Sequence, residues 1–246
     1  MIALRSALFY LGFSLWSLIW GVVILFFIPL SRRARSWACG FWARMAARWL
    51  AIACGLRYRV SGLEHIPADA CVIVANHQSA LETLLLWEYF PHISFVLKRE
   101  LFRIPVVGWA LPLSWPIGIA REQGRHALRQ VLEQGKERLA EGFHILIFPE
   151  GTRHACGQVG RFASTAAGLA LQAGAPMLPV AHNCGCFWPR GQWRKYPGTV
   201  EVRIGPPLQP RGHSPAELNH ILQERIRAEV TAMGPRRPPH GGRAHS

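Results

Sequence analysis

A histidine and a glutamate five residues apart are the side chains in this sequence best suited to acid–base chemistry. An apolar, β-branched run at residues 71–75 ends at Asn76 and His77, and Glu82 follows. Such a run predicts a buried strand that leads through a turn into a helix. Inside one regular helix the two side chains would lie about 140° apart, so they can meet only if His77 precedes the helix. A carboxylate beside His77 would then fix its tautomer and stabilise the imidazolium that forms when it acts as a general base.

A second apolar run, at residues 145–148, also ends in a polar turn. Pro149 donates no N–H and ends the strand, while Gly151 permits a positive φ and the close approach of a ligand. Such a turn can expose Thr152, backbone N–H groups and the planar fork of Arg153 to an anion such as phosphate. Taken alone, each stretch also has an ordinary interpretation: a surface histidine beside a glutamate favoured by the helix dipole, and a salt-bridged turn.

Together, the patterns NHxxxxE and FPEGTR resemble those of the glycerolipid acyltransferases, specifically the 1-acylglycerol-3-phosphate (lysophosphatidic acid) acyltransferases. Two further patterns agree, GxExxP at residues 62–67 and KxELxxIPxxG at residues 98–108. Alternating strands and helices predict an α/β fold. The resemblance implies a mixed, mostly parallel sheet flanked by helices, the glycerolipid acyltransferase fold, with an N-terminal membrane helix element.

The resemblance also implies a reaction. A fatty acyl group would move from acyl-CoA or acyl-carrier protein to the sn-2 hydroxyl of 1-acylglycerol-3-phosphate, giving phosphatidic acid for phospholipid biosynthesis. His77 would remove the hydroxyl proton, and Glu82, where most relatives carry Asp, would hold the imidazole. The sequence has no GxSxG nucleophile elbow, which favours direct transfer without an acyl-enzyme. No metal and no cofactor are expected beyond the acyl donor itself.

Most of the remaining candidate residues are assigned to substrate binding by the same resemblance. The expected phosphate-binding residues are Arg153, Arg121, Lys98, Glu150, Gly151 and Thr152, of which Glu150 and Gly151 shape the pocket. Arg121 follows a strand expected at residues 115–120, although its local sequence IAREQGR departs from the family's more usual order. Pro179 and Val180 match a fourth motif, whose role is either acyl-donor contact or structural.

Two alternatives remain open at this point. The acceptor could be another lysolipid or an amino-lipid, in which case a neutral acceptor would not need Arg153. The chain could instead be a non-catalytic, lipid-binding relative, an interpretation that the glutamate at position 82 would fit.

Composition favours a membrane as partner. Lys and Arg number 28 against 14 Asp and Glu, and half of the residues are hydrophobic. The charge would suit nucleic acid or an anionic membrane surface, but the hydrophobicity and the lack of any nucleic-acid-binding signature exclude the former. Residues 6–31 are uncharged and would form a helix of about 39 Å, longer than the roughly 30 Å hydrocarbon core. They predict a membrane anchor.

Basic residues predict the orientation of this anchor. Arg32, Arg33 and Arg35 follow the apolar segment, so the positive-inside rule places the catalytic domain on the cytoplasmic side of the inner or cytoplasmic membrane. Residues 37–56 fit either an amphipathic helix in the membrane interface or a helix packed on the protein core. The first two helices could span the membrane or form a monotopic hairpin.

The chain therefore divides into a membrane anchor (1–56), an α/β acyltransferase domain (57–205) and a C-terminal part (206–246). The last part comprises a helix at 215–233 and a basic tail whose Pro and Gly content predicts disorder. Alternating polarity at residues 199–204 predicts an edge strand within the domain.

The six cysteines show no spacing typical of a disulfide framework, which predicts a reducing, cytoplasmic setting. His182-x-Cys184-x-Cys186 lacks the fourth ligand and the CxxC spacing of common zinc sites, so we interpret it as structural.

Overall fold

The computed structural model describes residues 1–104, 107–120, 122 and 124–234. Arg121, part of the 98–108 motif and the predicted disordered tail from residue 235 onward lie outside the described residues. The strands are β1 (Leu56–Ser61), β2 (Val72–Ala75), β3 (Ile93–Lys98), β4 (Ile117–Ile119), β5 (His144–Ile147), β6 (Met177–His182) and β7 (Gly198–Ile204). The helices are α1 (Ile2–Val23), α2 (Arg32–Cys54), α3 (Leu81–Leu85), α4 (Val107–Ala110), α5 (Arg125–Ala140), α6 (Thr165–Ala173) and α7 (Pro215–Met233).

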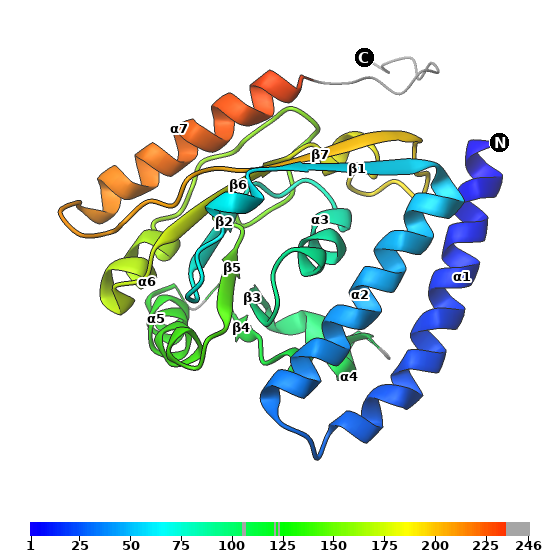
Figure 1. Ribbon diagram of the computed structural model, residues 1–246, viewed down its shortest axis with the longest axis horizontal. Coiled ribbons are helices and arrows are strands. Elements are labelled where there is room, and N and C mark those ends of the chain that lie inside the picture. The colour runs from blue at the N-terminus through cyan, green and yellow to red at the C-terminus, as the bar shows by residue number, and fades with distance from the viewer. Residues whose placement is uncertain (105–106, 121, 123, 235–246) are drawn as a thin grey trace.

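Within these residues the seven strands form one sheet in the order β1-β7-β6-β2-β5-β3-β4 (Figure 1). Neighbouring strands are parallel except for β6 and β7, which are antiparallel. The predicted mixed, mostly parallel sheet flanked by helices is therefore confirmed. Val74 lies opposite Ile147 of β5, and Ala75 lies opposite Val180 of β6, so these three strands end at the same edge. The segments that follow them are brought together there.

Both faces of the central strand β2 are covered, as expected of a buried parallel strand without polar alternation. Ile73 packs in the core beneath α1, α2 and α3, whereas Val72 and Val74 pack in the core formed with α5, α6 and α7. Figure 1 shows these two groups of helices on opposite sides of the sheet. The sheet is thereby held as a fixed platform for the loops at its edge.

Two sequence predictions about strands need correction. Residues 199–204 were expected to form an edge strand, but β7 lies between β1 and β6. Its alternation arises because Val200 and Val202 face the core while Glu201 is buried in an ion pair with Arg203 at 3.0 Å. The strand expected at 115–120 is shorter, Ile117–Ile119. Trp115 has φ 55°, which is not an extended conformation, so the strand begins only after it.

The N-terminal helices form an antiparallel hairpin that tryptophan side chains hold together. The indole N–H groups of Trp16, Trp20 and Trp49 donate to carbonyl oxygens on the opposite helix, each at 3.1 Å. Gly12 makes this approach feasible, since a Cβ there would lie 2.3 Å from the Trp49 ring. The predicted apolar segment is helical: α1 continues into a 3₁₀ helix at Ile24–Phe27, and together they are long and apolar enough to cross a membrane.

Helix α2 packs against the α/β part of the chain. Its small residues are buried beneath α1 and α3, namely Gly40, Ala43, Ala46, Ala47 and Ala53. This face of α2 fits the core-packed alternative for residues 37–56, and the interfacial interpretation stays a prediction for the exposed face. Trp37, by contrast, remains half exposed. The helix also begins earlier than predicted because Ser31 caps its N-terminus.

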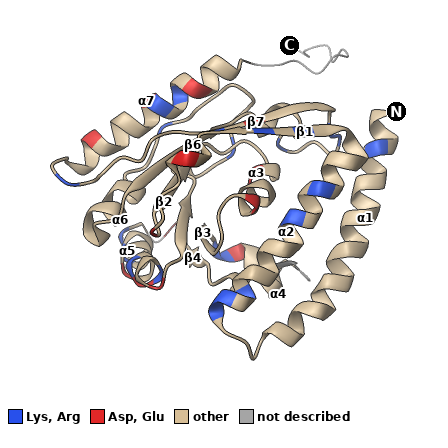
Figure 2. Cartoon of the chain, in the orientation of Figure 1, with Lys and Arg blue, Asp and Glu red and all other residues tan. Residues whose placement is uncertain are grey.

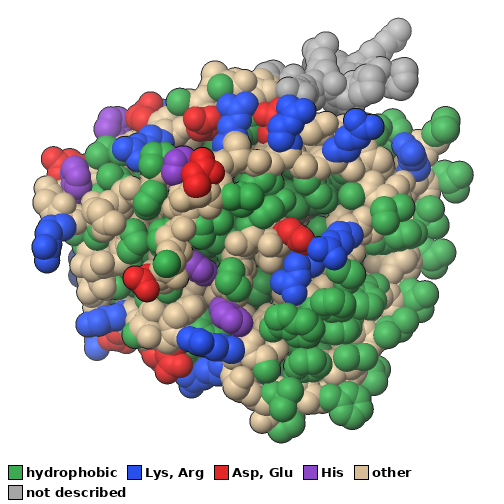
Figure 3. Space-filling view, viewed as in Figure 1, with side chains coloured by type: hydrophobic (Ala, Val, Ile, Leu, Met, Phe, Trp, Pro, Cys, Tyr) green, Lys and Arg blue, Asp and Glu red, His purple; other side chains and the backbone are tan. Residues whose placement is uncertain are grey.

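The first turns of α1 are attached to a later loop. The backbone N–H of Lys195 donates to Ser6 Oγ at 2.9 Å, and the fully buried Lys195 ammonium donates to Tyr10 Oη. That ammonium also lies 4.3 Å from the centre of the Trp188 ring, a favourable cation–π distance. Charged residues are sparse along the rest of α1, and apolar side chains gather on the side of the molecule where the hairpin lies (Figures 2 and 3).

Candidate active site

His77 and Glu82 meet at the carboxyl edge of β2. His77 lies in the turn between β2 and α3, as the five-residue spacing required, and Glu82 lies in the first turn of α3. The distance between His77 Nδ1 and Glu82 Oε1 is 2.8 Å. A carboxylate only accepts, so Nδ1 carries the proton and donates it, which leaves the Nε2 lone pair free to receive another proton. His77 lines a cavity, so the pair is placed for general-base chemistry.

The Glu82 carboxylate is held ionised inside the protein. Oε1 also accepts hydrogen bonds from the backbone N–H groups of Gln78 at 3.0 Å and Ser79 at 2.7 Å. Burial raises the pKa of Glu82, but the nearby His182 and the hydrogen bond from His77 outweigh burial and hold that pKa below its ordinary value. The Glu82 carboxylate therefore contacts His77 and the two residues that follow His77 in the turn.

The FPEGTR turn encloses His77 from the other side. The imidazole stacks on Phe148 with ring centroids 4.2 Å apart. The backbone N–H of His77 donates to Glu150 Oε1 at 2.6 Å, and its carbonyl oxygen accepts from the N–H of His154 at 2.8 Å. The Glu150 carboxylate is fully buried and also accepts from the N–H of Gly160. It therefore shapes the turn from within.

The cavity beside His77 has a volume of about 610 Å³, and both basic and apolar side chains line it. The predicted residues Lys98, Gly151, Thr152 and Arg153 are among the lining residues. So are apolar residues of the hairpin and of the segment after α3, including Trp20, Ile24, Trp42 and Trp87. Pro179 and Val180 are not among the lining residues; they are buried in β6, which favours the structural interpretation of their motif.

Arg190 is a cavity residue that sequence reasoning missed. Its guanidinium donates to Thr152 Oγ1 at 3.2 Å and to the carbonyl oxygen of Arg153 at 3.1 Å. It therefore adds a third cation to the cavity that Lys98 and Arg153 also line. Arg190 lies in an irregular segment with no periodic or motif signal, so only the fold reveals its position.

The His182-x-Cys184-x-Cys186 segment lies behind the dyad. Ligand atoms of Glu82, His182 and Cys184 lie within 4.8 Å of one another, a grouping that could hold a metal ion. However, His182 Nε2 donates to the carbonyl oxygen of Asn76 at 2.6 Å, and His182 Nδ1 accepts from the backbone N–H of Cys184 at 3.4 Å. Burial also raises the pKa of the Cys184 thiol, which disfavours the thiolate that a metal requires. These contacts favour a structural role.

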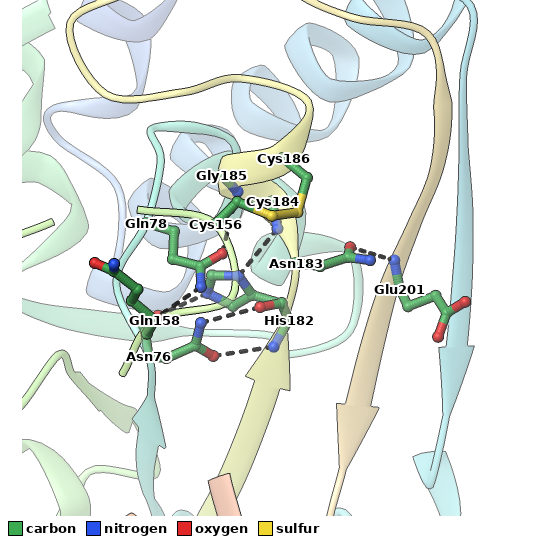
Figure 4. The surroundings of a disulfide bond; sticks show 10 residues. All are labelled: Asn76, Gln78, Cys156, Gln158, His182, Asn183, Cys184, Gly185, Cys186 and Glu201. Carbon is green, nitrogen blue, oxygen red and sulfur yellow. Dashed lines mark hydrogen bonds between the residues drawn. A yellow bond between two sulfur atoms is a disulfide. The ribbon is translucent and has the colours of Figure 1, made fainter. Parts of the chain in front are cut away.

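The expectation of no disulfide is wrong for one pair of cysteines. Cys156, in the loop after the FPEGTR turn, is bonded to Cys186, with a Cα–Cα distance of 4.9 Å (Figure 4). The sequence separation of 30 gave no hint, because only the common edge of β5 and β6 brings the two segments together. The other four cysteines, Cys39, Cys54, Cys71 and Cys184, are free.

Known proteins are similar to this chain in sequence and in fold. A model of the Acyltransferase family matches residues 57–183. The 1-acyl-sn-glycerol-3-phosphate acyltransferase of Pseudomonas aeruginosa is 44% identical over 95% of this chain and 93% of its own length. The chain belongs to the acyltransferase family.

Other acyltransferases extend the comparison. The crystal structure of the 1-acyl-sn-glycerophosphate (LPA) acyltransferase of Thermotoga maritima is similar with a TM-score of 0.80 and 27% identity, covering 98% of each chain. The human 1-acyl-sn-glycerol-3-phosphate acyltransferase alpha is 32% identical over 73% of this chain and 64% of its own length. The acyltransferase fold predicted from the motifs is thus confirmed over nearly the whole chain.

The geometry of the acyltransferase dyad makes a prediction for Glu82. Glu82→Gln keeps the length of the side chain but removes its charge, so we expect kcat to fall by on the order of 10²–10⁴-fold with little change in the acceptor KM. Glu82→Asp keeps the charge but shortens the reach, so its kcat should be intermediate. Steady-state kinetics would check this, with the exposed Glu133→Gln as a control that retains wild-type kcat. Near-wild-type turnover in Glu82→Gln would remove the carboxylate from the mechanism.

Proposed function

We infer that the chain transfers a fatty acyl group to 1-acylglycerol-3-phosphate, a lysophosphatidic acid, and so forms phosphatidic acid. The observation that carries this conclusion is a His–Glu dyad beside a cavity that both basic and apolar side chains line. An acceptor with a phosphate, a nearby hydroxyl and one acyl chain matches a lining of both kinds. The relatives described above carry the same activity in their names.

In the proposed reaction, His77 Nε2 takes the proton of the sn-2 hydroxyl as its oxygen attacks the thioester carbonyl of the acyl donor. Glu82 stabilises the imidazolium that results. The tetrahedral intermediate then expels the thiolate of the donor, which takes the proton from His77, so that phosphatidic acid and a free thiol are released. Either acyl-CoA or acyl-carrier protein can supply the thioester.

Direct transfer is supported by the cysteine that lines the cavity. Cys39 would be a candidate nucleophile by position. Burial, however, raises its pKa to about 12, so the thiol stays protonated and unreactive. The hydroxyl of the acceptor is therefore the nucleophile in this proposal.

We propose that Arg153, Lys98 and Arg190 bind the acceptor phosphate. All three line the cavity together with Gly151 and Thr152. Arg153 Nε is buried and has no hydrogen-bond partner among the described residues, as expected of a group that awaits an anion. Glu150 supports the turn from behind, and Arg121 stays a further candidate for the same phosphate.

The assignment is tested with purified protein, lysophosphatidic acid and either acyl-CoA or acyl-carrier protein, measuring free thiol and phosphatidic acid. We expect equimolar release of both products, and a His77→Ala rate lower by about 10²–10⁴-fold because general-base catalysis is lost. Neutral lysolipids serve as control acceptors. Preferred transfer to a neutral acceptor, or binding without thiol release, would instead support one of the two alternative functions.

The phosphate assignment is tested at Arg153. A charge-assisted hydrogen bond is worth roughly 1.5–3 kcal/mol, so Arg153→Ala should raise the acceptor KM about 10- to 100-fold and leave the donor KM nearly unchanged. Arg153→Lys should recover part of this loss, because lysine lacks the planar fork. The exposed Arg129→Ala is the matched control. An unchanged acceptor KM in Arg153→Ala would contradict the assignment.

We further propose that residues 1–56 attach the catalytic domain to the cytoplasmic leaflet as a hairpin that does not cross the membrane. Both ends of α1 meet the catalytic part of the chain, through Ser6 at the start and through Gly21 and Ile24 in the cavity wall. Residues 57–205 form the catalytic domain in this proposal, and 206–246 an appended C-terminal part.

Cysteines introduced at the exposed positions Leu4 and Leu30 test this topology. In right-side-out and everted membrane vesicles, a membrane-impermeant maleimide should label both Leu4→Cys and Leu30→Cys from the cytoplasmic side. The parent chain, with its native cysteines, gives the background labelling. Labelling of the two positions from opposite sides would show that α1 spans the membrane.

A further inference from the structure

Gln78, the residue directly after the base, occupies an unusual position in the site. Its side chain is fully buried, and the two ends of its amide contact different segments. Nε2 donates to the carbonyl oxygen of Gln158, and Oε1 accepts from the backbone N–H of Gly185, both at 3.3 Å (Figure 4). Gly185 fits closely, since a Cβ there would lie 2.7 Å from Gln78 Cβ. The amide is thus held between two loops.

The disulfide joins these same two loops. Cys156 is two residues before Gln158, and Cys186 directly follows Gly185. The bond therefore completes a closed path of contacts that runs through the Gln78 amide, and Figure 4 shows Gln78 next to Gly185 and the disulfide. Because Gln78 is also one of the residues whose N–H groups bind Glu82, its placement bears on the carboxylate as well as on the adjacent His77.

We propose that Gln78 is a positioning residue for the His77–Glu82 dyad and that the Cys156–Cys186 disulfide fixes the two loops that hold it. This inference rests on the proposed function, since turnover is one of its readouts. With the disulfide intact, the Gln78 amide has both partners at fixed positions and the turn at residues 76–80 keeps one geometry. With the bond broken, the segments around Gln158 and Gly185 lose their covalent link, so the two ends of the Gln78 amide are held less firmly and the dyad loses part of its preorganisation.

Reduction is chemically accessible from the proposed cytoplasmic side. Cys156 is partly exposed whereas Cys186 is buried, so an incoming thiolate reaches the Cys156 sulfur first. A dithiol reductant supplies two electrons and two protons: the S–S bond breaks, Cys156 and Cys186 become thiols, and the reductant closes to its own disulfide. Turnover of the enzyme therefore becomes dependent on the thiol–disulfide poise around it.

Phosphate binding should respond less than catalysis. Arg190 holds Thr152 and Arg153 through hydrogen bonds that do not involve the disulfide. Reduction should accordingly lower kcat while the acceptor KM stays within about twofold of its oxidised value, a split that a general loss of folding would not produce. The expected fall in kcat is about 3- to 10-fold, less than the roughly 10²-fold that a 1 Å misplacement can cost.

The experiment begins with the redox state. Alkylation of the unfolded, unreduced protein should modify the four free cysteines, and alkylation after dithiothreitol should modify all six. This count does not depend on activity. Six reactive thiols without reductant would overturn the inference and leave the proposed function untouched, whereas an intact disulfide in an inactive enzyme would contradict the proposed function.

Kinetics before and after dithiothreitol then form a double-mutant cycle. Reduction should lower the kcat of the wild type. Cys156→Ser should have the kcat of the reduced wild type both with and without dithiothreitol. The kcat of Gln78→Met should hardly change on reduction, because this variant has already lost the amide. The core variant Cys71→Ser should stay as sensitive as the wild type. Equal loss in wild type and Gln78→Met, or no loss in the wild type, would contradict the inference; the wild-type comparison needs no variant to fold.

Discussion

The hydrogen bond between His77 Nδ1 and Glu82 Oε1 is the contact on which the rest of the site depends. It requires a buried carboxylate to stay ionised, which the N–H groups of Gln78 and Ser79 and the imidazole itself make feasible. It also requires His77 to precede α3, and the end of β2 places it there. The strands β5 and β6 end at the same edge, so the loops that follow them close around this one pair.

The second constraint follows from the proposed function: an acyl thioester and a membrane lipid must both reach His77. The cavity meets it by having one wall from the sheet edge and another from the α1–α2 hairpin. The tryptophan hydrogen bonds that hold the hairpin, together with the buried Lys195, keep that apolar wall at a fixed place relative to His77. In the proposed function, membrane attachment and catalysis therefore depend on the same hairpin.

Local sequence signals predicted the parts of this structure that local physics determines. Local signals indicate three elements that the structure contains: the strand–turn–helix around His77, the turn after β5 and the helix at residues 215–233. Long-range partners were not predictable in this way. The polar residues that alternate in β7 are not solvent-exposed as in an edge strand, because Glu201 is buried in an ion pair with Arg203. Neither Arg190 nor the Cys156–Cys186 bond has a sequence spacing that indicates its partner. The packing of α2 could not be predicted either, because its small residues could have faced the membrane interface or the protein core.

The central claim is that Glu82 fixes His77 in the tautomer whose Nε2 can accept a proton. It is tested most directly by ¹⁵N NMR of protein labelled at its 11 histidines, with the His77 signals identified as those missing from a His77→Gln variant. At a pH where His77 is neutral, we predict a proton bonded to Nδ1 and an unprotonated Nε2. A proton on Nε2 would contradict the account, because the base would then face its substrate with no lone pair to offer.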